Sequence, residues 1–345
     1  MGSVNGSKPA GMGSWRKDDE LTDTQMEFEP EDPSDNITVK DLRDTNMPEY
    51  FTHFHALTRC RLTVRNVPGK LNILLSAYFY YKGSSERKDY TAGVKDARSV
   101  FLDSGCFSAL TGVMRGKLKP QAVHDWVARQ EDVVKGAWDM HNAGSPPGVV
   151  GVLDLPVYED LLAYSQLTVD DGQRITLENT VKMQALEKPP GWKPVYMVQG
   201  STAESYGRFT DQLEELGVLN EVREGTAILG VGGTLALRPP GLYTIYETVR
   251  GKLGPEGHIH ALGVSRRKAV AFLASRKWIQ SSDSSSAVRE VVLNNPPYHI
   301  SGPRPEYVTA AMSAANCLRY DVLIGRAIRE AEEKETMMQD ELMPA

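Results

Sequence analysis

The sequence has few cysteines and no long apolar run. Its three cysteines, Cys60, Cys106 and Cys317, lie far apart in a chain of 345 residues. This spacing excludes a disulfide framework and is typical of a reducing compartment. No apolar run approaches the ~20 residues needed to cross a bilayer, and the first residues, MGSVNGSKPAGMGSW, lack the hydrophobic segment of a secretory signal. We therefore expect a cytoplasmic protein with no membrane partner.

Nucleotide-binding motifs and internal repeats are also missing. The stretch LGVGGTL, residues 229–235, is not G-x-G-x-x-G, and it is not a P-loop because no Lys-Ser/Thr follows it. Nucleotide binding is therefore not expected at this stretch, and no cofactor is expected elsewhere.

Charge is unevenly distributed, although the whole chain carries a net charge of only −6. Residues 1–50 carry 5 basic and 12 acidic side chains, and residues 330–345 carry 1 basic and 6 acidic side chains. The remainder of the chain is therefore mildly basic, with a net charge of +6. A basic body permits a polyanionic partner but does not require one.

Composition divides the chain into a body and two tails. Residues 1–46 are rich in Gly, Ser, Pro and acidic side chains, so they are expected to form a disordered acidic tail. Residues 331–345, AEEKETMMQDELMPA, are expected to form a frayed helix end and an acidic tail. Residues 47–330 are left as the folded domain.

Short apolar segments alternate with helix-like segments in this domain. The strand candidates are Leu71–Phe79, Ser99–Gly105, Val149–Pro156, Pro194–Gly200, Ala227–Gly233, His258–Val264 and Lys277–Asp283. The helix candidates include Pro120–Lys135, Asp171–Leu186, Ala203–Leu216, Pro240–Gly251, Arg266–Ser275 and Glu306–Glu333. Near-continuous apolar strands between helices are typical of a parallel sheet covered by helices. We predict an α/β fold, a (β/α)8 TIM-like barrel with its eighth strand near Val291–Asn294, and a doubly wound sheet is the alternative.

Polar residues end several of these strands, where such barrels carry their active sites. They are Asp103, Asp154, Gln199-Gly200, Gly232-Gly233 and Asp283. A single strand-end Asp is more often a helix cap or turn residue, but three carboxylates on one barrel favour a functional site. His258 and His260 alternate on one strand and are expected to be hydrogen-bonded residues at the barrel rim rather than metal ligands.

These residue types suit one kind of chemistry. A carboxylate can attack an anomeric carbon while a second carboxyl moves the proton of the departing or arriving group, which is the logic of retaining glycosyl transfer. An Asp, a Gln and the backbone N–H groups of a Gly pair can read the edge of a purine, and Phe107 can stack on its face.

The motifs, in this order, resemble those of the tRNA-guanine transglycosylases and of their DNA-acting relatives, the 7-deazaguanine DNA transglycosylases of phages and some bacteria. The family's Asp-Ser-Gly-Gly-aromatic motif is similar to residues 103–107, and its third-strand Asp is similar to Asp154. Its Val-Gln-Gly, Gly-Gly and Leu-Met-Gly-Val motifs are similar to residues 198–200, 232–233 and 261–264. Its final Asp, followed six positions on by a basic residue, is similar to Asp283 with Arg289. The similarity covers roughly residues 70–290.

The resemblance implies a (β/α)8 barrel that exchanges bases. It makes Asp283 the nucleophile that displaces guanine from the sugar C1′ into a covalent glycosyl-enzyme intermediate, and Asp103 the general acid/base. It assigns the remaining residues to the base, with hydrogen bonds from Asp154, Gln199, Gly232 and Gly233 and a sandwich between Phe107 and Leu262. The target base must leave any duplex, which costs a few kcal/mol.

The chain departs from the family at two points. The tRNA enzymes carry Cys-x-Cys-x-x-Cys and a distal His after the last catalytic Asp, whereas only Cys317 and His299 lie in that region here. A closed structural zinc site needs four ligands, so no zinc and no zinc subdomain are expected. Because that subdomain supports RNA docking in the tRNA enzymes, its absence favours DNA as the substrate. Cys106 stands where the family usually has Gly, which is expected to crowd the turn beside Asp103.

Basic side chains follow the strands that carry the expected site. Arg266 and Arg267 follow the strand at 258–264, and Arg289 follows Asp283. We expect these three to contact phosphates that flank an extruded nucleotide. The expected partners are DNA and a free 7-deazaguanine base such as 7-cyano-7-deazaguanine, in the host cytoplasm if a phage encodes the protein. A homodimer is left open.

Three alternatives remain at this point. The same exchange can act on tRNA. The chain can be a non-catalytic barrel that binds nucleic acid, although the presence of both Asp103 and Asp283 argues against this. It can also be an unrelated barrel enzyme, such as a glycosidase or an aldolase, but an aldolase needs a strand-end Lys and Lys277 begins its strand candidate.

Overall fold

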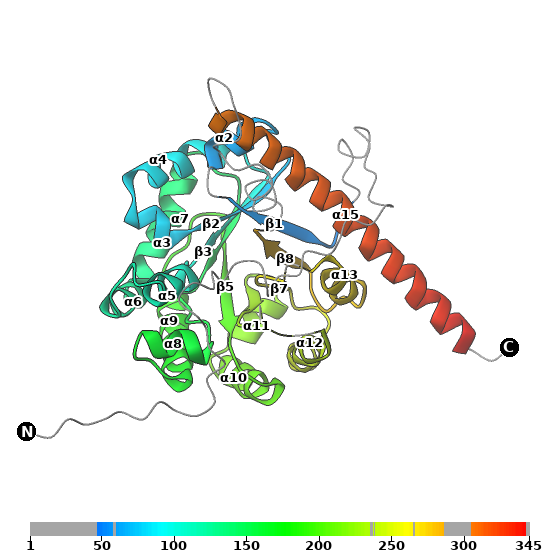
Figure 1. The fold of residues 1–345 in the computed structure, drawn as a ribbon. Coiled ribbons are helices and arrows are strands. Elements are labelled where there is room, and N and C mark those ends of the chain that lie inside the picture. The colour runs from blue at the N-terminus through cyan, green and yellow to red at the C-terminus, as the bar shows by residue number, and fades with distance from the viewer. Residues whose placement is uncertain are drawn as a thin grey trace, which may run out of the picture. The chain divides into compact units, whose positions relative to one another are not determined.

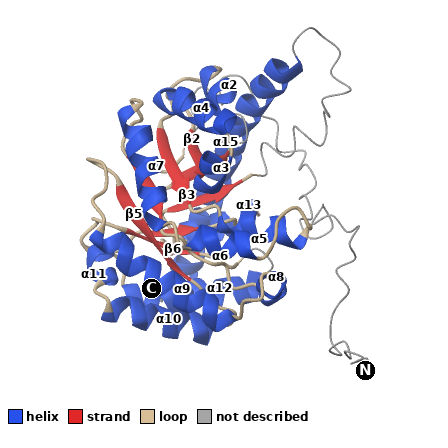
Figure 2. Ribbon diagram, turned by 90° about the vertical axis from the view of Figure 1, so that its left-hand side faces the viewer, coloured by secondary structure: helices blue, strands red, loops and turns tan. Residues whose placement is uncertain are grey.

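Eight parallel strands close into a barrel in chain order, which confirms the predicted (β/α)8 class. The computed structural model describes residues 47–57, 60–234, 237, 239–264, 266–285 and 305–342. The strands are β1 (Thr52–Ala56), β2 (Asn72–Ser76), β3 (Ser99–Asp103), β4 (Gly148–Gly151), β5 (Lys193–Val198), β6 (Ile228–Val231), β7 (Ile259–Ala261) and β8 (Ser281–Ser284). Figure 1 shows the strands at the centre of a ring of helices, and Figure 2 shows the barrel from the side.

The helices cover the outside of the barrel. They are α2 (Cys60–Arg65), α3 (Ala77–Lys82), α4 (Ser84–Gly93), the 3-10 helix Val94–Asp96, α5 (Cys106–Met114), α6 (Gln121–Val127), α7 (Gln130–Asn142), α8 (Glu159–Tyr164), α9 (Val169–Ala185), α10 (Ala203–Glu215), α11 (Val218–Arg223), α12 (Pro239–Leu253), α13 (Arg267–Ser275) and α15 (Pro305–Leu342). The predicted helix Pro120–Lys135 is divided into α6 and α7. None of the helices in the described ranges combines the length and apolar character that crossing a membrane requires.

The strand missing from the sequence prediction is the first one, β1. The segment Val291–Asn294, where an eighth strand was expected, lies outside the described residues. β1 reads THFHA, so two histidines interrupt the apolar pattern by which the other strands were found. Both are buried against partners, with His53 Nδ1 2.8 Å from Ser282 Oγ on β8 and His55 Nε2 2.9 Å from Asp321 Oδ1 on α15.

The long helix α15 packs against α2 and α13 on the outside of the barrel (Figure 1). It continues through the predicted boundary at 330 to Leu342, so residues 331–342 are helical rather than frayed. Contacts from the barrel reach this extension. Tyr50 Oη donates a 2.6 Å hydrogen bond to Glu332 Oε1, and Arg276 Nε lies 3.4 Å from Glu335 Oε1.

Successive side chains of a strand point to opposite faces of the sheet, so every second residue points into the barrel. The rings of Phe54, Phe101 and His260 come from β1, β3 and β7, and their centroids lie 4.9–5.8 Å apart. Rings from such distant strands meet only across the interior. Asp283 pairs in register with Phe54, and Asp103 lies two residues beyond Phe101 on β3. Both carboxylates therefore face the interior.

Candidate active site

The residues expected to perform the catalysis and to bind the base lie at one end of the barrel. Asp103 ends β3, Asp283 lies in β8, and Gln199 follows β5 directly. The remaining ones come from the loops that follow β4, β6 and β7, and they are Asp154, Gly232, Gly233 and Leu262. Because all eight strands are parallel, their carboxyl ends meet at this one face, which we call the C-terminal end of the barrel.

Asp154 and Gln199 form a buried hydrogen-bonded pair. Asp154 is 3% exposed, and its Oδ2 accepts a hydrogen bond from Gln199 Nε2. The Ser104 hydroxyl donates to the other oxygen, Oδ1, over 2.8 Å. Burial raises the pKa of Asp154 to about 6, against the lowering effect of these donors. The structure thus brings together two residues that are 45 positions apart in the sequence.

Asp103 lies in a turn, and its surroundings raise its pKa. Its Oδ2 accepts a 2.9 Å hydrogen bond from the Gly105 N–H. Burial, and the nearby carboxylates of Asp154 and Asp283, raise the pKa of Asp103 to about 7. Asp103 therefore has a turn-forming role, as many strand-end Asp residues do, and an acidity close to the neutral pH at which proton transfer is most efficient.

Gly105 is required by this turn, whereas Cys106 does not crowd it. Gly105 has φ +73, and a Cβ on it would lie 2.2 Å from Ser76 Oγ. Cys106 begins α5, outside the positive-φ region, and its N–H donates to Ser104 Oγ over 3.3 Å. The expected crowding by Cys106 is wrong because the residue at this position needs only ordinary helical backbone.

The raised pKa of Asp103 predicts that the barrel loses stability as the pH rises. Between its ordinary pKa of 3.8 and about 7, the folded state keeps a proton that the unfolded state releases, so the free energy of unfolding falls across this window. Asp103→Asn should remove this slope and be more stable than the wild type above pH ~7, by about 1–3 kcal/mol for a partly exposed side chain. Urea unfolding at pH ~5 and pH ~8 measures the difference. Asp211→Asn, on the outer helix α10, is the control, and equal pH slopes for the wild type and Asp103→Asn would contradict the shift.

The Gly pair after β6 lies against Gln199. A Cβ on Gly232 would lie 2.4 Å from Gln199 Nε2, and Gly233 has φ +73. The Tyr206 hydroxyl donates to the Gly232 carbonyl, and the Gly232 N–H donates to Val198 O over 3.2 Å. Among the described residues, Gln199 Oε1 is buried and accepts no hydrogen bond, so it is available to a donor on a ligand.

Phe107 and Leu262, the expected sandwich, lie on α5 and in the loop after β7. Phe107 is 36% exposed, and its ring meets Tyr158 edge-on, with centroids 6.0 Å apart. Leu262 is half-buried. Both follow strands at the C-terminal end of the barrel, and their stacking on a base stays a prediction.

Asp283 is held through one of its two carboxylate oxygens. Its side chain is 13% exposed. Oδ1 accepts a 2.9 Å hydrogen bond from the Gly263 N–H and lies 3.1 Å from His260 Nε2. Within the described residues, Oδ2 makes no hydrogen bond. His260, which was expected at the rim without a role in the site, lies on β7 two residues before Leu262, and this spacing was the signal that it reaches the site.

The three basic residues expected to contact phosphates are placed only in part. Arg266 and Arg267 are half-buried at the start of α13, after the loop that carries Leu262. Arg289 lies outside the described residues, as does His299. Among the described residues, no group of three or more His, Cys, Asp or Glu is arranged to hold a metal ion.

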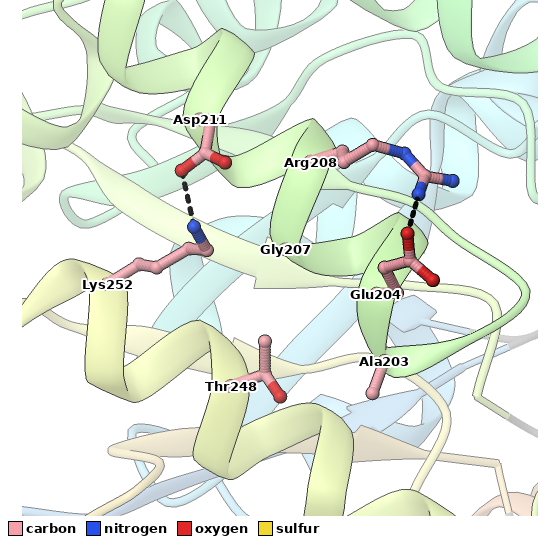
Figure 3. Close-up of a pocket in the computed structure, with 7 residues that line it drawn as sticks. All are labelled: Ala203, Glu204, Gly207, Arg208, Asp211, Thr248 and Lys252. Carbon is pink, nitrogen blue, oxygen red and sulfur yellow. Dashed lines mark hydrogen bonds and ion pairs between the residues drawn. The ribbon is translucent and has the colours of Figure 1, made fainter.

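A groove of about 310 Å³ lies elsewhere, between the outer helices α10 and α12 (Figure 3). Two ion pairs border it, Lys252 Nζ to Asp211 Oδ1 and Arg208 Nη1 to Glu204 Oε1, each at 2.5 Å. It contains none of the residues expected in the site.

The arrangement at the C-terminal end of the barrel can perform acid/base and nucleophilic chemistry. It combines a carboxyl group that titrates near neutrality, a second carboxylate with one unengaged oxygen, and a buried Asp–Gln pair beside a Gly turn. The functional inference depends on this geometry, because the chain matches no protein-family model and no curated protein.

Proposed function

We propose that this protein is a guanine transglycosylase, which exchanges guanine in DNA for a 7-deazaguanine base through a covalent glycosyl-enzyme intermediate. The observation that carries the proposal is the pair of unlike carboxyl groups inside one end of the barrel. Asp103 has its pKa raised to about 7, whereas Asp283 offers a carboxylate anchored at Oδ1. Two carboxyl groups in environments that separate their roles are the usual requirement of retaining glycosyl transfer.

The exchange proceeds in two displacements at C1′. In the first, Asp283 attacks C1′, the bond from C1′ to guanine breaks, and Asp103 gives its proton to the departing guanine. In the second, Asp103 takes a proton from the incoming base, this base attacks C1′, and the bond to Asp283 breaks. Two inversions give net retention. Water must be excluded between the two steps, because hydrolysis of the intermediate would leave an abasic site.

The base-recognition groups complement the edge of guanine. Asp154 and Gln199 Oε1, which has no hydrogen-bond partner in the described part of the chain, are acceptors that suit the N1–H and N2 amino donors of guanine. The Gly232 N–H already donates to Val198 O, which leaves the Gly233 N–H for guanine O6. Phe107 and Leu262 supply apolar contacts to the ring. Arg266, Arg267 and Arg289 supply positive charge for the phosphates of the DNA backbone.

The test is base exchange measured with the purified full-length chain. Duplex DNA, single-stranded DNA and tRNA are each incubated with 7-cyano-7-deazaguanine, and the nucleosides are analysed by mass spectrometry. We expect the modified deoxynucleoside to appear in DNA. Incorporation into tRNA alone would replace the DNA assignment by the tRNA alternative. No exchange in any of the three substrates would overturn the proposal.

Gly232→Ala should weaken binding of the base. The added methyl group would lie within 2.4 Å of Gln199 Nε2, so Gln199 must move away from Asp154. We expect the KM for the free base to rise about 10- to 100-fold, the cost of one lost buried polar contact, with a smaller change in kcat. Gly251→Ala on α12 is the matched control, because nothing lies within 4 Å of its added Cβ. An unchanged KM for the base in Gly232→Ala would argue against recognition by Gln199.

A further inference from the structure

A chain of hydrogen bonds runs through the barrel interior from Asp283 to His258, apart from the base-recognition groups. His260 Nε2 lies 3.1 Å from Asp283 Oδ1, and His260 Nδ1 lies 2.8 Å from Ser281 Oγ. The same hydroxyl oxygen lies 2.7 Å from His258 Nε2. His260 and Ser281 are only 2% and 1% exposed, so bulk water does not compete for these bonds.

The direction of each bond follows from the Asp283 end of this chain. The proposed nucleophile must be an ionised carboxylate, which can only accept, so the proposed function requires the proton on His260 Nε2. In a neutral imidazole the other nitrogen accepts, so the Ser281 hydroxyl donates to Nδ1. This uses the only proton of Ser281, and its oxygen therefore accepts from His258 Nε2–H. Burial, assisted by the neighbouring His260, Lys193 and Arg250, lowers the pKa of His258 to about 3, which keeps His258 neutral.

The His260 ring is also held sterically. It meets Phe101 edge-on, with centroids 4.9 Å apart and an interplanar angle of 85°. Phe54 lies against it with centroids 5.8 Å apart. Rotation of the imidazole would displace these buried rings, so the direction of Nε2–H towards Asp283 is fixed before any substrate binds.

We propose that His260 is a positioning residue for Asp283. Together with the Gly263 N–H, His260 holds Oδ1 of Asp283, and Oδ2 is therefore the oxygen that attacks C1′. This inference rests on the proposed function. The bond from Nε2 orients the carboxylate and leaves Oδ2 without a donor among the described residues. Oδ1 becomes the carbonyl oxygen of the glycosyl ester. When the incoming base breaks the bond from C1′ to Oδ2, the electron pair returns to the carboxylate, and both donors stabilise the returning charge.

Two substitutions at His260 separate positioning from packing. His260→Gln keeps an amide N–H near the place of Nε2, whereas His260→Leu has a similar volume and no donor. We expect His260→Leu to lower kcat and the single-turnover rate of adduct formation about 10- to 100-fold, with the KM for the base unchanged. His260→Gln should recover most of this loss. His141→Leu, on the outer helix α7, is the matched control and should retain wild-type rates.

Two kinetic outcomes would overturn the positioning role. One is a His260→Leu protein with wild-type kcat, and the other is a correctly folded His260→Gln protein as slow as His260→Leu. Circular dichroism and thermal melting establish that each variant is folded.

A measurement independent of activity separates this inference from the proposed function. Long-range ¹H–¹⁵N NMR of the imidazoles in the wild type should show His260 protonated at Nε2 and unprotonated at Nδ1, with the signal assigned by its loss in His260→Gln. A proton on Nδ1 alone would overturn the inference even if base exchange is observed. The expected tautomer without exchange on DNA or tRNA would instead overturn the nucleophilic role and, with it, the proposed function.

Discussion

Asp283→Asn is expected to abolish base exchange, with a loss of at least ~10⁴-fold in kcat, as is usual when a covalent nucleophile is removed. Asparagine keeps the shape of the side chain, and its amide oxygen can still accept from the Gly263 N–H and His260. What it loses is the anionic oxygen that forms the bond to C1′. The fold should therefore survive while the chemistry stops.

The measurement follows the covalent intermediate as well as turnover. Wild-type protein mixed with oligonucleotide in the absence of an incoming base should give a denaturation-resistant adduct of protein and DNA, which peptide mass spectrometry locates at Asp283. Asp211→Asn is the control, because its side chain is 57% exposed and pairs with Lys252 on the outer helices. Exchange by Asp283→Asn within tenfold of the wild type would overturn the assigned nucleophile.

Asp103→Asn is expected to lower kcat by about 10²- to 10⁴-fold, the contribution of a positioned general acid/base. Departure of guanine needs the protonated form of Asp103, whose pKa burial and the Asp154 and Asp283 carboxylates raise to about 7. The single-turnover rate of adduct formation in the wild type should therefore fall as the pH rises through about 7. In Asp103→Asn the residual rate should lack this ionisation.

The second half-reaction supplies the complementary result. Attack by the incoming base needs the deprotonated form of Asp103, so the rate at which free base removes a preformed adduct should rise through the same pH. The opposite signs of the two slopes distinguish proton transfer by one residue from a general effect of pH on the fold. Identical slopes in both half-reactions would contradict the assignment of Asp103 as both acid and base.

The sequence predicts the barrel well wherever burial on both faces makes a strand apolar. Leu71–Phe79 contains β2, and Pro194–Gly200 overlaps all of β5 except its first residue. β1 breaks the pattern, because His53 and His55 satisfy their polar atoms on Ser282 and Asp321. These partners are more than 200 residues away and cannot be recognised from local composition. The burial that makes THFHA a strand is supplied by a helix at the other end of the chain.

The sequence was enough to predict which residues form the candidate site, but not which hydrogen bonds join them. Strand ends and motif order identify Asp103, Asp154, Gln199 and Asp283. Strand register and side-chain packing decide that Gln199 donates to Asp154 and that His260 Nε2 lies 3.1 Å from Asp283 Oδ1, and neither contact follows from spacing. The raised pKa of Asp103 is likewise a result of its burial near Asp154, in the loop after β4, and Asp283, on β8.

Closure of the barrel has a consequence for how the protein is made. β8 pairs with β1 as well as with β7, and the His53–Ser282 hydrogen bond spans 229 residues. Contacts of such long range form late, because their loop-closure entropy must be overcome first. At roughly 5–20 residues per second of synthesis, Asp154 and Gln199, which we propose recognise the base, leave the ribosome before Asp283 can be set between its neighbouring strands. A growing chain can thus begin to assemble the proposed base pocket before the proposed nucleophile is in place.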